Sequence, residues 1–324
     1  MRTGIKITMV FVVVWISLLL LEDLYDFGLK QNQNIKMASV KNSPPCTDLL
    51  VHGPCEPLWM ISPALLDQQT GISSYNLALS HSDFADNYLH LYYYLKYNKA
   101  PKYLLLYVTP ESLDKHYNTF NSYRFAPYLS DTLVNKVVRE NDPAYFKWTW
   151  IPFMKYAYYN NRFNFDVLQG YKHYFSGRKS AYYPDGFEPP TKRAWGNHTG
   201  EFAQLYKENT VFKPDSLREK YLHKTIRMAK EKKIRVFLYE SPVLYEALAF
   251  QPNRDEMIDR IKKIAVEEQV PFIQFEKLAM AKEKRYFVST LNFNMEGVIL
   301  FNDTLGRFFN SVILGNEPLS PCAK

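Results

Sequence analysis

Short apolar segments alternate with longer amphipathic ones along most of this chain of 324 residues. The clearest apolar segment, Lys102–Val108, places apolar side chains on both faces of an extended strand, which is typical of a parallel sheet covered by helices on each side. Such an alternation predicts an α/β domain with a parallel sheet. The expected strands are 48–52, 71–79, 102–108, 234–239 and 271–275, and the expected helices are 83–96, 215–233, 254–268 and 294–310.

An uncharged apolar run, Ile7–Leu21, lies near the N-terminus, with Arg2 and Lys6 before it and acidic residues after it. The run is shorter than the roughly 20 residues that span a bilayer, but apolar neighbours on both sides lengthen it. Positive charge on the N-terminal side predicts that this end lies in the cytoplasm. Because no small-residue cleavage site follows, we favour an uncleaved signal anchor over a signal peptide. We therefore expect a single-pass protein of the cell membrane, with residues 30–324 outside the cytoplasm.

Two segments interrupt the strand–helix alternation. Residues 28–47 are polar and contain proline, which predicts a linker. Residues 114–210 are rich in Tyr, Phe, Trp, Asn and Pro and predict an insertion of short helices and irregular structure. We expect this insertion to cap the carboxyl edge of the sheet, where open α/β sheets bind ligands, although such a surface is equally suited to docking a partner. The predicted organisation is a membrane anchor at 1–27, a linker at 28–47, an α/β domain at 48–113 and 211–324, and a helical, aromatic-rich cap at 114–210.

The positive charge of the chain, +7 at neutral pH, is dispersed along it. No Gly-rich phosphate loop or nucleic-acid motif accompanies the charge, so we expect no nucleic-acid partner. A weak attraction to an anionic membrane or glycan is compatible with it. None of the seven histidines has metal-ligand spacing with a second His or Cys. The sequence therefore predicts no metal site and no cofactor.

The three cysteines are Cys46, Cys55 and Cys322. In an oxidising compartment an odd number leaves at least one thiol outside any disulfide within the chain. Cys46 lies in the expected linker and Cys322 in the C-terminal tail, so these two are able to pair. Glycosylation sequons begin at Asn197 and Asn302, and we interpret both as chance matches because the second lies in an expected helix.

The stretch 48–56, which reads Asp-Leu-Leu-Val-His-Gly-Pro-Cys-Glu, resembles the first block of the SGNH/GDSL hydrolases. In that family a strand ends in Gly-x-Ser and the serine is the nucleophile; aligned on Gly53, this position holds Cys55. Residues 61–67 and 71–79 resemble the membrane-anchored extracytoplasmic branch of the family, which includes teichoic-acid D-alanine transfer and alginate acetylation proteins. The resemblance covers roughly 48–113 and 215–312. It implies a three-layer, flavodoxin-like α/β fold.

The same resemblance predicts a degenerate catalytic triad. The family carries Asp-x-x-His near its C-terminus, where this chain has Ser289 and Asn292 in the acid and base positions but keeps Asn294 and Gly297. In this branch the second strand ends in an Asn, followed by a Gly that supplies an oxyanion N–H. Here the Asn is Asn76 and the Gly position is occupied by His81. The third block, Gly-x-Asn-Asp, is replaced by Val108-Thr-Pro-Glu111.

Cys55, Glu56, His81, Glu111 and Glu240 each lie at or just past the carboxyl end of an expected strand. They are therefore expected along one edge of the sheet. A thiol is a nucleophile when an imidazole acts as its base, so we assign Cys55, His81 and Glu240 as candidate catalytic residues, with Glu111 as an alternative orienter.

The alternative is a structural role, in which Cys55 is a small buried residue and His81 a polar group at a helix start. Pro54 favours this alternative because it removes an N–H from the turn that would hold the oxyanion. The candidate binding residues are Gly53, Asn76, Glu111, Asn292 and Asn294.

The resemblance implies an extracytoplasmic accessory protein in O-acylation, such as acetylation, of a cell-surface polysaccharide. Its partner would be a membrane-bound O-acyltransferase, and its ligand the polysaccharide or an acyl donor. Two alternatives stay open from the residues. One is a catalytically inactive pseudo-hydrolase that acts as a binding or assembly module, and the other is a Cys-dependent esterase.

Overall fold

The computed structural model describes residues 2–44, 46–116, 120–159, 163–179, 183–190 and 211–314. Its contacts divide the chain into two compact units. The helical unit consists of residues 1–42 and 120–182, and the sheet unit of residues 43–119 and 183–324. Each unit has its own hydrophobic core.

The sheet unit contains five parallel strands in the order β2-β1-β3-β4-β5, so the predicted α/β class and parallel sheet are confirmed. The strands are β1 (Leu49–His52), β2 (Ser74–Asn76), β3 (Tyr103–Tyr107), β4 (Arg235–Glu240) and β5 (Phe272–Gln274). The chain steps outward in one direction from β1 to β2 and in the other from β1 to β3. The order in which strands are added to the sheet therefore reverses at β1. Open α/β sheets bind their ligands at such a reversal, beside the carboxyl ends of the strands.

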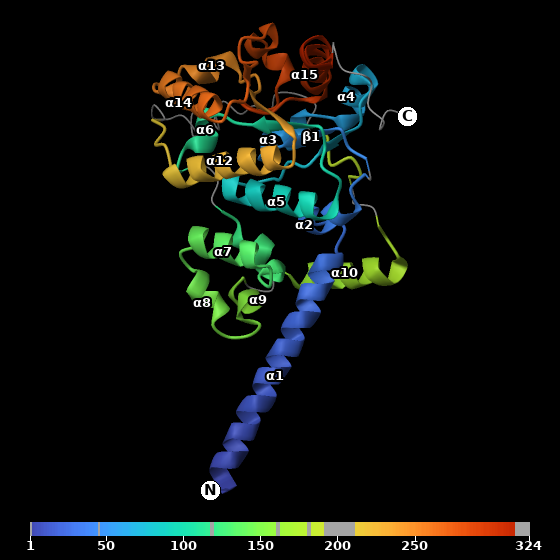
Figure 1. The fold of residues 1–324 in the computed structure, drawn as a ribbon, viewed down its shortest axis with the longest axis vertical. Coiled ribbons are helices and arrows are strands. Elements are labelled where there is room, and N and C mark those ends of the chain that lie inside the picture. Colours follow the sequence, from blue (N-terminus) through green and yellow to red (C-terminus); the bar gives the residue numbers. More distant parts are fainter. Residues whose placement is uncertain are drawn as a thin grey trace. The chain divides into compact units, whose positions relative to one another are not determined.

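Helices flank the sheet on both faces (Figure 1). The principal ones are α4 (Pro63–Thr70), α5 (Phe84–Tyr97), α12 (Ser216–Glu231), α14 (Arg254–Glu267) and α15 (Met295–Phe308). Shorter helices are α3 (Cys55–Met60), α6 (Pro110–Leu113), α13 (Tyr245–Leu248), η3 (Ala279–Lys282), η4 (Lys284–Tyr286) and η5 (Phe309–Leu314). α4 pairs with α15 on one side, and α5 pairs with α12 on the other.

Alternation along each strand explains how both faces are filled. Val51 and Leu105 are paired in register and point into the cluster that also contains Val298 and Leu305 of α15. Their neighbours Leu50 and Leu104 are also fully buried but are not members of that cluster. Since successive side chains of a strand point to opposite faces, the strands are apolar throughout, as the sequence predicts.

The helical unit contains no strand among the residues that the structure describes. Its elements are α1 (Arg2–Gln31), α2 (Lys36–Ser39), η1 (Val40–Asn42), η2 (Ser122–Tyr128), α7 (Thr132–Asn141), α8 (Tyr145–Thr149), α9 (Met154–Tyr158) and α10 (Asn164–Ser176). Leu29 of α1, Tyr156 of α9 and Val167 of α10 belong to its core. α1 therefore folds together with part of the predicted cap.

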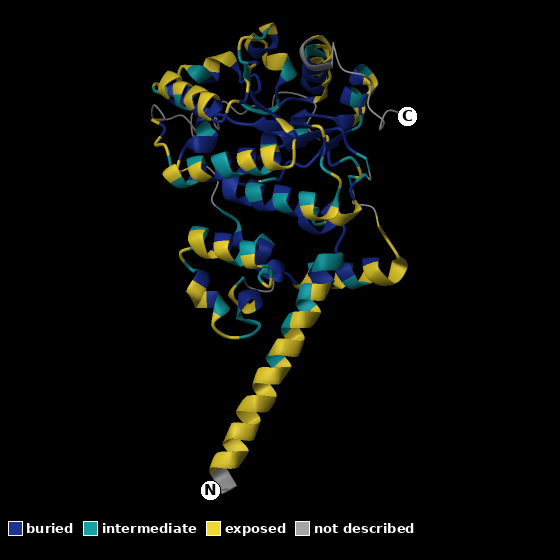
Figure 2. Cartoon of the chain, in the orientation of Figure 1, coloured by how far each residue is buried: buried dark blue, intermediate teal, exposed yellow. Residues whose placement is uncertain are grey.

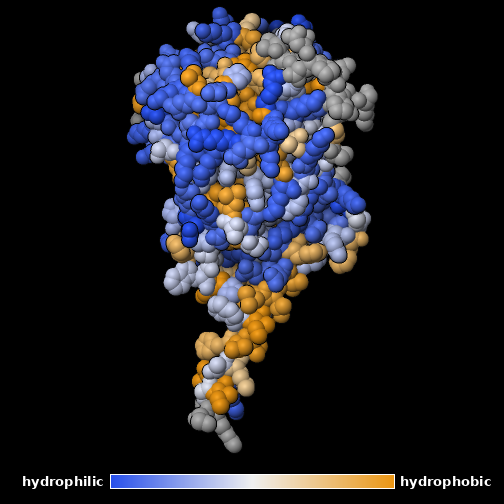
Figure 3. Space-filling model, viewed as in Figure 1, coloured by the Kyte–Doolittle hydropathy of each residue, from blue (hydrophilic) through white to orange (hydrophobic). Residues whose placement is uncertain are grey.

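The N-terminal helix is long and apolar enough to cross a membrane. None of its apolar window is buried against the protein, and its side chains are exposed along most of its length (Figure 2). Figure 3 shows the same stretch as a hydrophobic surface. These features agree with the predicted apolar anchor.

The polar residues after the apolar run are drawn into the helical unit rather than exposed as a stalk. α1 continues to Gln31, beyond the predicted end at residue 27. The side chain of Asn32 is fully buried and donates a hydrogen bond to the Asp166 carbonyl oxygen at 3.0 Å. Composition alone predicts a linker here, but bonds from α10 satisfy these polar groups. The predicted position of the 114–210 insertion over the sheet edge stays a prediction.

Candidate functional site

Cys55 begins α3 directly after the turn that ends β1. Gly53 in this turn has a φ of +151°, and a Cβ on it would lie 2.7 Å from Cβ of Tyr107. Only glycine fits without displacing β3, so this turn requires the Gly that the sequence analysis selected as a binding residue. The turn leaves Cys55 half-buried at the carboxyl end of β1, where the direction of winding changes.

The sulfur of Cys55 contacts two consecutive residues of the loop that follows β2. The backbone N–H of His81 donates a hydrogen bond to Cys55 Sγ at 2.9 Å. The hydroxyl of Ser80 lies 3.6 Å from Cys55 Sγ and 2.8 Å from Nδ1 of His81. The structure thus brings Cys55 and His81 together, but it is the Ser80 hydroxyl that lies between the sulfur and the imidazole.

His81 has a φ of 49°, a left-handed conformation that is uncommon for a residue other than glycine. This is the position at which the resembled family has a glycine. The unusual backbone aims the His81 N–H at the sulfur, and such a bond stabilises negative charge on it. The Ser80 hydroxyl offers the thiol proton a path to the imidazole. The catalytic roles of Cys55 and His81 stay predictions.

Ser80 was missed by the sequence reasoning. Its position immediately before the candidate base was the available signal, but its contact with sulfur depends on how the loop turns after β2. The left-handed backbone at His81 turns its N–H toward the sulfur, while its imidazole bonds the Ser80 hydroxyl.

Asn76, the last residue of β2, fixes the position of α3. Its Nδ2 donates hydrogen bonds to the carbonyl oxygens of Pro57 at 2.7 Å and Ile61 at 2.8 Å. Its Oδ1 accepts a bond from the Ala78 N–H at 3.0 Å, and the side chain is fully buried. These bonds orient Asn76 toward α3, so it positions Cys55 through that helix.

A buried acid lies next to Cys55. Glu56 is 5% exposed, and Tyr107 of β3 and Tyr239 of β4 are almost completely buried. Burial, followed by the nearby charge of Glu56, raises the pKa of each tyrosine well above its usual value. Both phenols therefore stay protonated at physiological pH, and Tyr107 lies 3.3 Å from the hydroxyl of Ser241.

Glu240, at the end of β4, is fully buried and forms an ion pair with Arg254. Arg254 also contacts Glu276 at 3.0 Å. Burial raises the pKa of Glu240 to about 7, because the Arg254 guanidinium offsets only part of the desolvation cost and the charges of Glu111 and Glu276 add to it. The predicted role of Glu240 in orienting His81 stays a prediction, since its described ion pair is with Arg254.

Glu111 belongs to the same polar network. It accepts a hydrogen bond from Nε2 of Gln251 at 2.6 Å, and Gln251 in turn accepts one from Arg254 at 2.9 Å. A cleft of about 610 Å³ lies against this network. Its lining includes Gln251, Arg254, Glu276 and the exposed ring of Tyr245. Charged and polar side chains line part of the cleft, but Cys55 does not line it.

The C-terminal positions that the resemblance assigns to the acid and base bond to each other. Asn292 donates from its backbone and from Nδ2 to Ser289 Oγ, at 3.2 and 3.0 Å. Neither side chain titrates near neutral pH, so this pair lacks a general acid or base. Asn294 caps α15 by accepting a bond from the Gly297 N–H at 3.0 Å. Its role is therefore to start the last helix.

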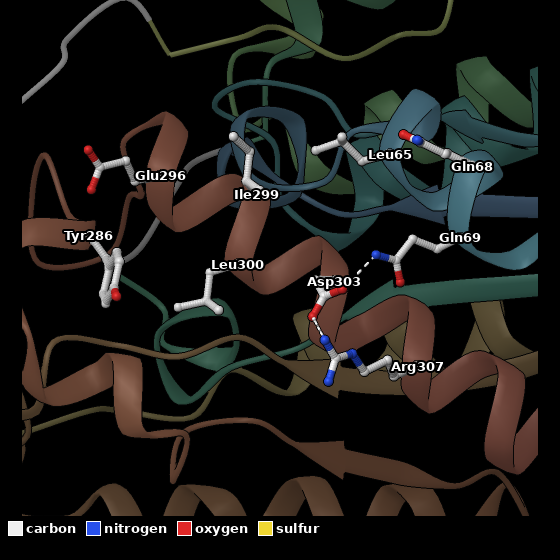
Figure 4. Close-up of a pocket in the computed structure, with 9 residues that line it drawn as sticks. All are labelled: Leu65, Gln68, Gln69, Tyr286, Glu296, Ile299, Leu300, Asp303 and Arg307. Atoms are coloured by element: carbon white, nitrogen blue, oxygen red, sulfur yellow. Dashed lines mark hydrogen bonds and ion pairs between the residues drawn. The ribbon is translucent and has the colours of Figure 1, made fainter.

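A second open pocket, of about 800 Å³, lies between α4 and α15 (Figure 4). Asp303 lines this pocket, accepts a hydrogen bond from Gln69 at 2.6 Å and pairs with Arg307 at 2.7 Å. Leu65, Ile299 and Leu300 give it an apolar wall. No cysteine, serine, histidine or strand end is among its lining residues, so we do not assign it a catalytic role.

Cys46 is in a disulfide, whereas Cys55 is not. Cys322, His198 and the Asn197 sequon lie outside the described residues. Asn302 is fully buried and bonds the Met60 carbonyl oxygen at 2.7 Å, in agreement with a chance sequon. Among the described residues no group of His, Cys, Asp and Glu side chains has the geometry to hold a metal ion.

No known family model matches this chain, and no curated protein matches it. The fold and the geometry around Cys55 therefore carry the functional argument. Together they define an α/β protein with a polarised thiol at the carboxyl edge of a parallel sheet, joined to an apolar N-terminal helix.

Proposed function

We propose that this chain is a membrane-anchored extracytoplasmic protein that carries an acyl group on Cys55 during O-acylation of a cell-surface polysaccharide. The observation that supports this most directly is the contact of one sulfur with a backbone N–H and a serine hydroxyl. The hydroxyl is in turn bonded to an imidazole. A structural cysteine has no need of such an arrangement, whereas a nucleophile does.

The proposed chemistry is acyl transfer through a thioester. Cys55 Sγ attacks the carbonyl carbon of an acyl donor, the bond from that carbon to its leaving group breaks, and a sulfur–carbon bond forms. The thiol proton passes to Ser80 Oγ while the Ser80 proton passes to Nδ1 of His81. His81 gives that proton to the leaving group of the donor as it departs. A glycan hydroxyl then attacks the carbonyl carbon of the thioester, the carbon–sulfur bond breaks, and the hydroxyl proton passes to the sulfur, which restores the thiol and releases the glycan ester. Atoms and charge balance without a metal or an oxidant.

The replaced triad favours transfer over hydrolysis. The Ser289–Asn292 pair holds no group that would activate water, because neither side chain accepts a proton near neutral pH. An acyl group on Cys55 would therefore wait for an acceptor that supplies its own reactive hydroxyl. The proposed partner is a membrane-bound O-acyltransferase that delivers the acyl group, in keeping with the resemblance to an SGNH-like three-layer fold in the membrane-anchored branch.

The first test is acetylation of the full-length protein in detergent by p-nitrophenyl acetate. We expect a stoichiometric burst of p-nitrophenolate without turnover, and a mass increase of one acetyl group on the Cys55 peptide that hydroxylamine removes. Cys55→Ala should abolish the burst. Loss of general-base help should slow it about 10²-fold or more in His81→Gln.

Controls separate the relay from general damage. His116→Gln changes an exposed histidine outside the site, and Ser289→Ala removes a serine at the family acid position. Both should leave the burst unchanged, whereas Ser80→Ala should slow it. A burst that survives in Cys55→Ala, or continuous turnover by the wild type, would contradict the transfer proposal. Turnover abolished by Cys55→Ala would instead identify a Cys-dependent esterase.

A second candidate is a pseudo-hydrolase that binds a glycan or partner without chemistry. The mutual bonding of Ser289 and Asn292 favours it, since the positions that would complete a triad serve each other. The two functions differ in a cell. If Cys55→Ala restores polysaccharide acylation in a strain that lacks the protein, binding is sufficient; if it fails while the variant is present in normal amount, the thiol is required.

A further inference from the structure

The helical unit leaves many large apolar side chains exposed. They lie on α8, α9, α10 and the segment between α8 and α9, and are Phe146, Trp150, Ile151, Tyr158, Phe165, Leu168, Tyr174 and Phe175. Exposed apolar side chains in such number on one unit point to a surface that meets another phase or partner. These side chains belong to the same unit as the apolar helix α1, which limits what that partner is.

The segment between α8 and α9 lies at the height where the apolar run of α1 ends. Glu22 is the residue directly after that run, and its carboxylate accepts a hydrogen bond from the Phe153 N–H. Glu22 also pairs with Lys155 at 2.9 Å. In Figure 1 this segment extends furthest along α1 toward its N-terminus. Trp150, which is 75% exposed, is therefore carried at the boundary of the apolar surface.

α10 crosses α1 in direct backbone contact. A Cβ added to Gly170 would lie 1.7 Å from the carbonyl oxygen of Gly28, so the two helices meet glycine against glycine. On one side of the crossing, Asp166 and His173 of α10 bond the residues that follow α1. The Asp166 carbonyl accepts from Asn32 at 3.0 Å, and His173 Nδ1 accepts from the Gln33 N–H at 3.1 Å. That side of α10 faces away from the apolar run.

The other side of α10 faces toward the apolar run. Asn164 accepts a bond from the Tyr25 hydroxyl at 2.9 Å, and the Tyr171 hydroxyl donates to the Leu24 carbonyl at 3.1 Å. Both partners precede the crossing at Gly28. Residues 164, 168, 171 and 175 are spaced by four, three and four, so they share one helical face.

Leu168 and Phe175 therefore point toward the apolar half of α1. They are 67% and 80% exposed. Aromatic and aliphatic side chains on one face of a helix that lies beside a membrane span are typical of residues that enter the bilayer interface.

We propose that the helical unit is a platform seated on the bilayer surface, with α10 lying in the lipid interface and Leu168, Phe175 and Trp150 inserted into it. This rests on α1 crossing a bilayer, which is part of the proposed function. Lipid is favoured over a protein partner because these side chains continue the apolar surface of α1 at the level where that surface meets the headgroups. The unit would then hold the chain against the membrane at several points.

The test uses the full-length chain in a Cys55→Ser background, reconstituted in vesicles of phosphatidylcholine and phosphatidylglycerol alone. A nitrobenzoxadiazole fluorophore is attached to Leu168→Cys or Phe175→Cys, and to the sequence neighbours Gln169→Cys and Ser176→Cys as matched controls. Val12→Cys reports separately on the span. We expect the labels at 168 and 175 to shift to shorter emission wavelength, to be quenched by lipid with a shallow nitroxide, and to be protected from iodide.

The controls should show the opposite pattern, with iodide quenching and no shift. If the label at 12 is quenched by lipid with a deep nitroxide while 168 and 175 stay open to iodide, the platform is wrong and the anchor stands. If protection at 168 and 175 appears only in native membranes that contain other proteins, the surface docks a protein and the platform is again wrong. Failure of lipid to quench the label at 12 would overturn the anchor of the proposed function itself.

Discussion

Replacing the buried acid at the end of β4 should make the protein less sensitive to pH. Glu240 has a pKa of about 7 in the folded chain, against an ordinary value of 4.5. Between these two values the folded state keeps a proton that the unfolded state loses, so the stability of the wild type falls as pH rises through this window. The difference of about 2.5 units corresponds to about 3 kcal/mol at 1.36 kcal/mol per unit.

Glu240→Gln keeps the shape of the side chain but has no proton to lose. We expect the variant to match the wild type near pH 4 and to be more stable by about 3 kcal/mol above pH 7, most of the change falling between pH 4.5 and 7. Arg254 keeps its contact with Glu276 in the variant, which limits the cost of removing one partner.

The measurement is hydrogen–deuterium exchange of peptides that cover β4, in full-length wild type and variant at the same series of pH values. Comparing the two proteins at each pH cancels the intrinsic pH dependence of exchange. The reasoning would be refuted by a stability difference that stays constant across the range, or by a variant that becomes relatively less stable as pH rises.

Three further outcomes are expected. Gly170→Ala should separate α10 from α1 and speed proteolysis of the helical unit, because its Cβ would overlap the Gly28 carbonyl. Gly4→Ala is the matched control, since its Cβ would meet nothing within 4 Å. Equal rates of proteolysis for the two variants would count against the crossing. Asn302→Ala should cost about 2 to 3 kcal/mol in urea unfolding, since it leaves the buried Ser62 N–H without its acceptor. Thr304→Ala, which removes only a solvent-exposed bond to the Leu300 carbonyl, should have no measurable effect. A C-terminal alkaline phosphatase fusion should be active, and activity of a cytoplasmic reporter there instead would reverse the proposed orientation.

The strands that lie in the middle of the sheet could be predicted closely. β3 and β4 differ from their expected bounds by one residue, because burial on both faces leaves an uninterrupted apolar run. β2 is shorter than expected, covering only Ser74–Asn76. Gly71 ends α4 in a left-handed conformation and Asn76 turns the chain by bonding the Ala78 N–H, so the flanking apolar residues are not extended.

The helices before β2 were not predicted. α3 contains Pro57 and α4 begins at Pro63, and proline reads as a break in a sequence although it is well suited to the first turn of a helix. For the polar segment after α1, composition predicts a linker because it contains no information on the hydrogen bonds that α10 makes to this segment. Such bonds depend on residues more than a hundred positions away in the chain, as between Asn32 and Asp166.

Part of the site followed from one rule and part did not. Residues at the carboxyl ends of parallel strands lie along one edge, which predicts that Cys55 and His81 lie close together, and the His81 backbone N–H does contact the sulfur. The predicted thiol–imidazole pairing stays a prediction. The same rule does not predict which hydrogen-bond or ion-pair partner each of these side chains has. Glu240 is paired with Arg254, which lies at the start of α14, and the choice depends on how that helix returns to the sheet.

The ion pairs at the end of the apolar run bear on which membranes this helix fits. Ile7–Leu21 rises only about 22 Å as an α-helix, whereas a hydrocarbon core is about 30 Å thick. Extending the run to Phe27 reaches about 31 Å but takes in Glu22, Asp23 and Asp26. Lys155 pairs with Glu22 and with Asp26 at 2.9 Å, which would offset part of the cost of bringing that turn to the edge of a bilayer. In the proposed membrane-anchored protein, a lysine outside the helix would thus extend the length of chain that can span, and its loss would leave a helix matched to a thinner membrane.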